Sequence, residues 1–210
     1  MLEIHTYVLG PVQTNAYLIG DPNTCQAVVI DPAWNGRLIV EAAEKLSWRL
    51  TSIWLTHAHF DHLGGVGVIL ELVKPPPLVA LHPDDRELWR MQGGAPFFGL
   101  QVDLGPEPTE ELRHGQVLEL GIYRFEVRHT PGHTPGHVIF YCADQGLVFC
   151  GDVIFNGSIG RTDLPGGDFD TLIDSIQNQI FSLPDETRLL SGHGPETTVG
   201  EERRENPFFS

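Results

Sequence analysis

The chain has 210 residues, which is long enough to bury a hydrophobic core without disulfide bonds. It carries 28 acidic against 13 basic residues, a formal net charge of -15, which excludes long-range attraction to nucleic-acid phosphates. Its three cysteines form no CxxC pair, and it contains neither a signal-peptide pattern nor an apolar stretch of about 18 residues. These features predict a cytoplasmic protein that binds no nucleic acid and no membrane.

The first half of the chain predicts a β-meander followed by alternating helices and strands. Short apolar runs separated by Gly-Pro and Asp-Pro turn signals indicate strands, whereas apolar residues three and four apart indicate helices. In chain order we expect strands at 4–9, 16–19 and 27–30, a helix at 36–48, a strand at 53–55, a helix at 63–73, a strand at 78–81 and a helix from 82 to about 91.

The second half repeats this order in kind. Residues 92–108 are rich in Gly and Pro without a steady period, so we expect them to connect the halves. After them we expect strands at 117–120, 123–128, 138–141 and 147–150, a helix at 169–180 and a strand at 188–190. This order predicts an α/β fold, a four-layer αββα sandwich. We expect a single domain, with halves at about 1–105 and 106–200.

Four side chains that can bind metals lie within six positions, directly after the apolar run 50–56. They are His57, His59, Asp61 and His62. If the segment stays extended, residues 57, 59 and 61 face one side and His62 lies at the turn into a helix. Imidazole and carboxylate groups suit Zn, Fe or Mn, and four of them exceed what one tetrahedral ion with an open position takes. The motif therefore predicts two metal ions.

Three further ligand candidates follow predicted strands and stand beside glycines. They are His133 in Pro131-Gly132-His133, Asp152 after Cys150-Gly151, and His193 in Gly192-His193-Gly194. Glycine lets the backbone turn sharply and approach an ion closely. A lone histidine of this kind is more often structural, but three such residues together with the His-rich motif favour a common metal centre.

The order HxHxDH, His, Asp, His resembles the metallo-β-lactamase superfamily at all seven positions. The resemblance implies one ion on His57, His59 and His133, a second on Asp61, His62 and His193, and Asp152 bridging both. His129 and His137 flank the matched histidine, and we interpret them as structural or supporting residues.

Loop motifs narrow the resemblance to small glyoxalase II-like (hydroxyacylglutathione hydrolase-like) proteins. These motifs are 157–168, 191–195 and 202–208. The resemblance implies hydrolysis of glutathione thioesters, yet the C-terminal helical extension of full-length glyoxalase II enzymes, which helps to hold glutathione, has no counterpart after His193. Arg161 then becomes the predicted anchor for a substrate carboxylate, and an ion pair with Asp163 or Asp168 is the alternative.

Two other residues have possible supporting or structural roles in the sequence. Asp31, at the end of the run 28–30, is predicted to accept a proton from a ligand histidine, although Asp-Pro is also an ordinary turn signal. Cys150 precedes Asp152 within an apolar strand, and we interpret it as a small buried hydrophobe and not as a nucleophile.

The predicted chemistry is attack on a small-molecule thioester by a hydroxide that bridges two divalent ions, with zinc first and iron or manganese as alternatives. Asp61 would orient that hydroxide or accept its proton. Two other functions stay open: a mononuclear iron enzyme resembling persulfide dioxygenases, and a metal-binding module without catalysis. The Phe97-Phe98 pair is predicted to pack within its own domain, to form a pocket rim, or to form the contact of a homodimer or another partner.

Overall fold

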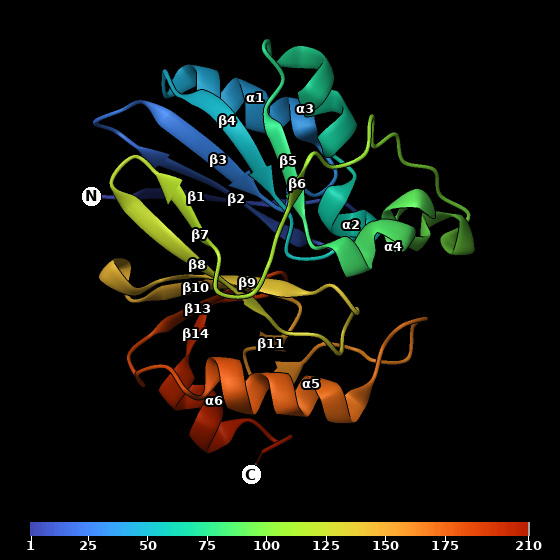
Figure 1. The fold of residues 1–210 in the computed structure, drawn as a ribbon, viewed down its shortest axis with the longest axis vertical. Coiled ribbons are helices and arrows are strands. Elements are labelled where there is room, and N and C mark those ends of the chain that lie inside the picture. The colour runs from blue at the N-terminus through green and yellow to red at the C-terminus, as the bar shows by residue number, and fades with distance from the viewer. Residues whose placement is uncertain (210) are drawn as a thin grey trace.

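A computed structural model describes residues 1–209 and places them in two β-sheets that pack face to face between layers of helices (Figure 1). The predicted α/β architecture of four layers is confirmed. Each main sheet has six strands, and a two-stranded hairpin lies beside the second sheet.

The first sheet has the order β1-β2-β3-β4-β5-β6 and the second the order β14-β13-β10-β9-β8-β7. The strands of the first sheet are β1 (Glu3–Leu9), β2 (Thr14–Asp21), β3 (Gln26–Ile30), β4 (Arg49–Trp54), β5 (Leu78–Leu81) and β6 (Glu110–Glu111). Those of the second are β7 (Val117–Leu120), β8 (Tyr123–His129), β9 (Val138–Cys142), β10 (Leu147–Gly151), β13 (Arg188–Ser191) and β14 (Thr197–Thr198). The hairpin consists of β11 (Ile154–Phe155) and β12 (Ser158–Ile159).

The helices are α1 (Gly36–Lys45), α2 (Phe60–Leu63), α3 (Val66–Leu72), α4 (Arg86–Arg90), α5 (Phe169–Ser175) and α6 (Val199–Glu205). Short 3-10 turns occupy Pro83–Asp85, Gln92–Phe98 and Ala143–Gln145, and a π-helical turn at Ile176–Ile180 continues α5. Helices α1 and α3 cover the outer face of the first sheet, and α5 and α6 that of the second (Figure 1). None of the helices within residues 1–209 is long and apolar enough to cross a bilayer.

The helix starts follow from local side-chain chemistry. The Asn35 side chain accepts a hydrogen bond from the Leu38 backbone N–H at the start of α1. Asp168 does the same for Thr171 at the start of α5, with a donor–acceptor distance of 2.8 Å. Such caps satisfy backbone donors that the first helical turn leaves free.

The core between the sheets fixes how the two halves face each other. Trp54 of β4 packs against Phe125 of β8 and Phe140 of β9, with ring centroids 5.2 and 5.5 Å apart. Tyr17 of β2 packs edge to face on Phe149 of β10. These rings are buried, and aromatic pairs of this geometry contribute beyond their buried area. This packing fixes the positions of the two sheets relative to each other.

Strand direction brings the functional loops to one end of the molecule. Strands β3, β4 and β5 are mutually parallel, β10 and β13 are parallel, and β8 runs in the direction of β10. Two backbone hydrogen bonds join the sheets there: Val138 N–H donates to the Thr56 carbonyl at 2.8 Å, and Asn15 N–H donates to the Gly192 carbonyl at 2.7 Å. The carboxyl ends of six strands therefore surround one site.

The structure corrects the expected helix at 63–73. It begins already at Phe60, and it is divided into α2 and α3 at Gly64 and Gly65. The start of α1 packs closely there, since a Cβ on Gly36 would lie 2.2 Å from the Gly65 carbonyl oxygen. Asp61 therefore lies on a helix, and the expectation of an extended segment with residues 57, 59 and 61 on one face is wrong beyond His59.

The short elements β6, β11, β12, β14 and α6 were not expected from the sequence. Helix α6 begins with a capping box in which Thr198 and Glu201 exchange hydrogen bonds, and this Thr-x-x-Glu spacing was a readable signal.

Gly93 lies where the turn Gln92–Phe98 packs against the start of α2. Its φ is +62°, and an added Cβ would lie 2.4 Å from the Phe60 nitrogen and 2.7 Å from the Ala58 carbonyl oxygen. We expect Gly93→Ala to lower the free energy of unfolding by about 2–4 kcal/mol, measured by urea denaturation. Gly99→Ala is the matched control, since Gly99 has φ +70° with no atom within 4 Å of the added Cβ, and it should cost about 1–2 kcal/mol. Equal losses would show that the close approach does not matter.

Candidate metal centre

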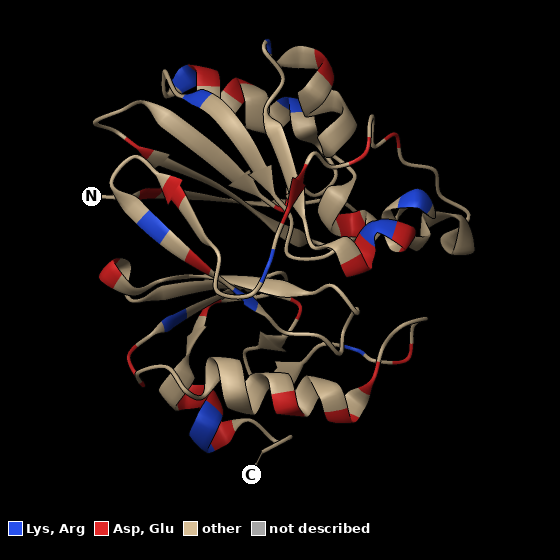
Figure 2. Cartoon of the chain, in the orientation of Figure 1, with Lys and Arg blue, Asp and Glu red and all other residues tan. Residues whose placement is uncertain are grey.

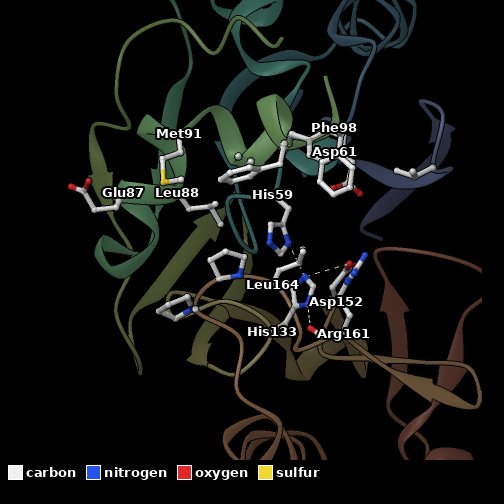
Figure 3. A pocket seen from close by; sticks show the side chains of 18 of the residues that line it. His59, Asp61, Glu87, Leu88, Met91, Phe98, His133, Asp152, Arg161 and Leu164 are labelled. Carbon is white, nitrogen blue, oxygen red and sulfur yellow. Dashed lines mark hydrogen bonds and ion pairs between the residues drawn. The ribbon is translucent and has the colours of Figure 1, made fainter. Parts of the chain in front are cut away.

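All seven side chains that the motifs assigned to metal ions lie at the shared end of the two sheets. They come from the loops that follow β4, β8, β10 and β13, so four separate chain segments meet here. The members are His57, His59, Asp61, His62, His133, Asp152 and His193. Figure 3 shows His59, Asp61, His133 and Asp152 among the side chains that line one cavity.

Three histidines form the first group. Nε2 of His133 lies 2.9 Å from Nδ1 of His59 and 3.3 Å from Nε2 of His57. All three are buried. Burial lowers the pKa of His57 and His133, and it lowers the pKa of His59 to about 3. The three rings are thus neutral at neutral pH, the form in which imidazole binds a metal ion.

Carboxylates and histidines form the second group, next to the first. Nε2 of His193 lies 3.3 Å from Oδ2 of Asp61 and 3.4 Å from Oδ2 of Asp152. Nε2 of His62 lies 3.5 Å from Oδ2 of Asp61 and 3.3 Å from Oδ1 of Asp152. Asp152 Oδ2 is also 3.7 Å from Nε2 of His133, so this carboxylate lies between the two groups.

The atoms that face inward have the chemistry of metal ligands. Within residues 1–209, Nε2 of His62 and Oδ1 of Asp152 are buried without a hydrogen-bond partner, which costs free energy unless an ion satisfies them. A Cβ on Gly192 would lie 2.1 Å from Asp152 Oδ1 and 2.6 Å from His62 Cε1, so this position admits only glycine. The buried His and Asp groups indicate a dinuclear metal site.

The histidines of the second group carry extra protons that a metal ion would displace. Burial alone would raise the pKa of Asp61, but His62 and His193 hold it at about 2. Burial would likewise lower the pKa of His193, but Asp152 and Asp61 raise it to about 9. Without an ion, therefore, protons on these histidines balance the carboxylates at neutral pH. Binding of a metal ion to this group must release those protons.

The nitrogens that face away from the centre are held by polar partners. Asp31 Oδ2 lies 2.9 Å from Nδ1 of His62 and accepts the Thr56 hydroxyl hydrogen at 2.6 Å. Because that hydroxyl donates to Asp31, it can only accept from Nδ1 of His57, 2.9 Å away. One buried carboxylate thus fixes the orientation of one histidine in each predicted ion site, where the sequence had predicted a single ligand partner for Asp31.

Asp85 is a functional residue that the sequence patterns missed. This buried carboxylate accepts hydrogen bonds from Ala58 N–H at 2.9 Å, the Thr134 hydroxyl at 2.8 Å and Gly136 N–H at 2.7 Å. It therefore ties the loop that carries His59 to the loop that carries His133. Its position four residues after the end of β5 is the available signal, but the pattern His82-Pro83-Asp84-Asp85 indicates only the start of a helix.

The sequence patterns assign no role to Thr14, and they indicate only an unspecified structural or supporting role for His137 and His129. The hydroxyl of Thr14, the first residue of β2, donates to Asp61 Oδ2 at 3.0 Å. Nε2 of His137 accepts from Asp152 N–H at 3.1 Å, so His137 positions the shared carboxylate. His129 points elsewhere, and its ring stacks on His82 with centroids 4.2 Å apart.

Five of the seven predicted ligands, His59, Asp61, His133, Asp152 and His193, line an open cavity of about 650 Å³ (Figure 3). Arg161 lies at its edge, where its carbonyl oxygen accepts from Nδ1 of His133 at 2.7 Å. Its guanidinium forms a bidentate ion pair with Asp163, with both N–O distances 2.7 Å. Of the roles considered from the sequence, the ion pair with Asp163 is present. Cys150 is fully buried, and burial raises the pKa of its thiol, as expected for a structural cysteine.

Comparison with known proteins identifies the family. Residues 9–193 match the model of the metallo-beta-lactamase superfamily. The chain belongs to the metallo-β-lactamase superfamily. It is 36% identical over 213 residues to hydroxyacylglutathione hydrolase GloC of Haemophilus influenzae, with 100% of this chain and 99% of the relative covered. Together with the His and Asp groups, this makes the protein a probable metal-dependent hydrolase.

Two solved structures have the same fold over at least 97% of the chain. The crystal structure of BLEG-1 B3 metallo-beta-lactamase superposes with a TM-score of 0.91 at 37% identity and covers 100% of both chains. The crystal structure of TTHA1623 in a di-iron-bound form has a TM-score of 0.88 at 41% identity and covers 97% of this chain and 99% of that chain. One structural relative thus binds two iron ions.

The link between Asp31 and two ligand histidines predicts a loss of metal affinity in Asp31→Asn. We expect about a ten- to hundredfold weaker affinity for zinc, measured by chelator competition, because loss of an outer partner leaves the imidazole free to rotate and less basic. Asp21→Asn is the matched control, since Asp21 is also fully buried but bonds only Asn23 and Thr24 in the turn after β2. An equal change in both variants would contradict a specific role for Asp31.

Proposed function

We propose that this protein hydrolyses thioesters of the S-acylglutathione type, with S-lactoylglutathione as the reference substrate, using a dinuclear metal centre. The observation that carries the proposal is the pair of ligand groups that share Asp152 at the base of an open cavity. The full-length similarity to a hydroxyacylglutathione hydrolase supports the substrate class.

Two divalent ions complete this proposal, with zinc as the first choice and iron or manganese as alternatives. The di-iron-bound relative supports iron as one of them. His57, His59 and His133 would hold one ion, Asp61, His62 and His193 the other, and Asp152 both. When bound, such ions lower the pKa of a water between them and polarise the substrate carbonyl.

The protein's own residues favour a leaving group that departs without a proton. Asp61 has a pKa of about 2 and is held by Thr14, so it is suited to orient the attacking water as a hydrogen-bond acceptor. The pKa of His59 is about 3, and that of His133 is also lowered, so neither ring is an imidazolium that could protonate a leaving group. Metal binding would release the extra proton of His193. A thiolate leaves unaided because thiol pKa values are about 8.5, whereas the amine of an amide needs protonation. This difference supports thioesters over amides and lactams.

The alternative of a mononuclear iron enzyme would leave the second group without a role. Its buried and unpartnered His62 Nε2 and Asp152 Oδ1 support a second ion. Oxygen uptake with glutathione persulfide by the iron-loaded protein, in place of thioester hydrolysis, would reverse this choice.

Arg161 is the proposed anchor for a glutathione carboxylate, which would exchange with Asp163. Because its guanidinium is half exposed, we expect Arg161→Gln to raise KM for S-lactoylglutathione only about two- to fivefold, with kcat unchanged. Steady-state kinetics with an N-acetylcysteamine thioester of the same acyl group gives the control, since this carrier has no carboxylate. An equal rise in KM for both carriers would rule out the anchor.

His133 and Asp61 test the proposed catalysis itself. We expect His133→Ala and Asp61→Ala to lower kcat/KM for S-lactoylglutathione by at least about a hundredfold, because loss of a ligand must exceed loss of an outer partner. His5→Ala is the control, since His5 lies in β1, packs on Trp48 and does not line the cavity. Turnover at the wild-type rate in both ligand variants would refute the proposed function.

A further inference from the structure

One wall of the active-site cavity is built from apolar side chains. Leu88 and Met91 from α4 and its C-terminal end, Phe97 and Phe98 from the following turn, and Leu164 from the opposite loop all line the cavity (Figure 3). Phe97 is 70% exposed and Phe98 53% exposed. Large apolar groups that gather in a concave site beside catalytic side chains are typical of a ligand-binding surface.

This wall is fixed to the metal motif. The Phe98 ring packs against Phe60, with centroids 5.3 Å apart, and Phe60 stands directly between His59 and Asp61. The turn that carries Phe98 approaches the motif at Gly93, where no side chain fits. The apolar wall therefore starts beside the predicted metal ligands and continues away from them. When the carbonyl carbon of a substrate lies at the metal centre, the rest of the substrate can lie along this wall.

The charges around the wall do not favour an anionic group. Arg161 is the basic residue among the described residues that line the cavity, and Asp163 neutralises it. On α4, Arg90 pairs with Glu87 and Glu107, and Asp84 and Glu87 themselves line the cavity. Figure 2 shows acidic and basic residues side by side in this region. The part of a substrate that contacts the wall is therefore not anionic, and the apolar side chains themselves favour an uncharged group.

We propose that the apolar wall selects thioesters with an apolar acyl chain over the small hydroxyacyl group of S-lactoylglutathione. This inference rests on the proposed function and specifies its substrate. Hydrolysis breaks the C–S bond and forms a C–O bond to the oxygen of water. The hydrogens of that water end on the thiol and the carboxylic acid, so no other reactant is needed. The products are a fatty acid and the free thiol.

The test is a series of S-acylglutathiones with lactoyl, acetyl, butanoyl, hexanoyl and octanoyl groups, assayed with the metal-loaded protein below their micelle concentrations. The carrier is constant, so only the acyl group varies. We expect kcat/KM to rise about two- to fourfold for each added methylene, mainly through a lower KM, because each methylene leaves water for an apolar surface. A flat or falling series, with the lactoyl thioester among the best substrates, overturns the inference while leaving the proposed function intact.

Variants locate the preference on the wall. We expect Phe98→Ala and Met91→Ala to lower the ratio of octanoyl to acetyl kcat/KM at least about fivefold. Phe208→Ala is the matched control, since Phe208 is 46% exposed but lies outside the cavity. An unchanged ratio of octanoyl to acetyl kcat/KM in Phe98→Ala overturns the inference. If the same variant also converts a homodimer into a monomer, the apolar wall binds a second copy of the chain in place of an acyl group.

A binding measurement separates the two proposals if no thioester is hydrolysed. S-octylglutathione and S-methylglutathione are thioethers that cannot be cleaved, and calorimetry gives their dissociation constants. Tighter binding of the octyl compound that is lost in Phe98→Ala supports the apolar wall although the proposed reaction has failed. Equal binding of both compounds overturns the inference as well.

Discussion

The position of Asp152 between two groups of histidines is the constraint on which the site depends. A carboxylate at this depth is unfavourable unless positive charge surrounds it, and in this structure His62 and His193 supply that charge. Divalent ions would supply it more strongly. The backbone of Asp152 is held by His137, and Gly192 leaves room for its side chain, so the fold places this carboxylate before any ion binds. Metal binding then completes a site that is already shaped.

The sequence predicted the layers and the seven inward-facing residues because these features are local. Hydrophobic periods indicate the strands, and the spacing from His57 to His62 together with Gly-His and Gly-Asp contexts marks the ligand loops. The residues that hold the ligands were harder to predict. Asp85 and Thr14 act on loops far away in the chain, and such contacts exist only after the sheets have packed. The start of α2 at Phe60 lies against the turn at Gly93, which is another contact between segments far apart in the chain.

The proposed chemistry and the proposed specificity depend on different parts of the chain. The strand ends carry the proposed chemistry, and buried hydrogen bonds hold them rigid. The apolar wall instead comes from α4 and the Gly- and Pro-rich segment that shows no period in the sequence. Such a segment can change its side chains without disturbing the sheets. One architecture serves relatives with different named activities.

Anomalous X-ray scattering from crystals of the zinc- or iron-loaded protein is the most direct test of the dinuclear centre. The account predicts two peaks, one coordinated by His57, His59 and His133 and the other by Asp61, His62 and His193, with the Asp152 carboxylate bound to both. A single peak on the three histidines, with His62 and His193 free of metal under saturating conditions, would contradict it.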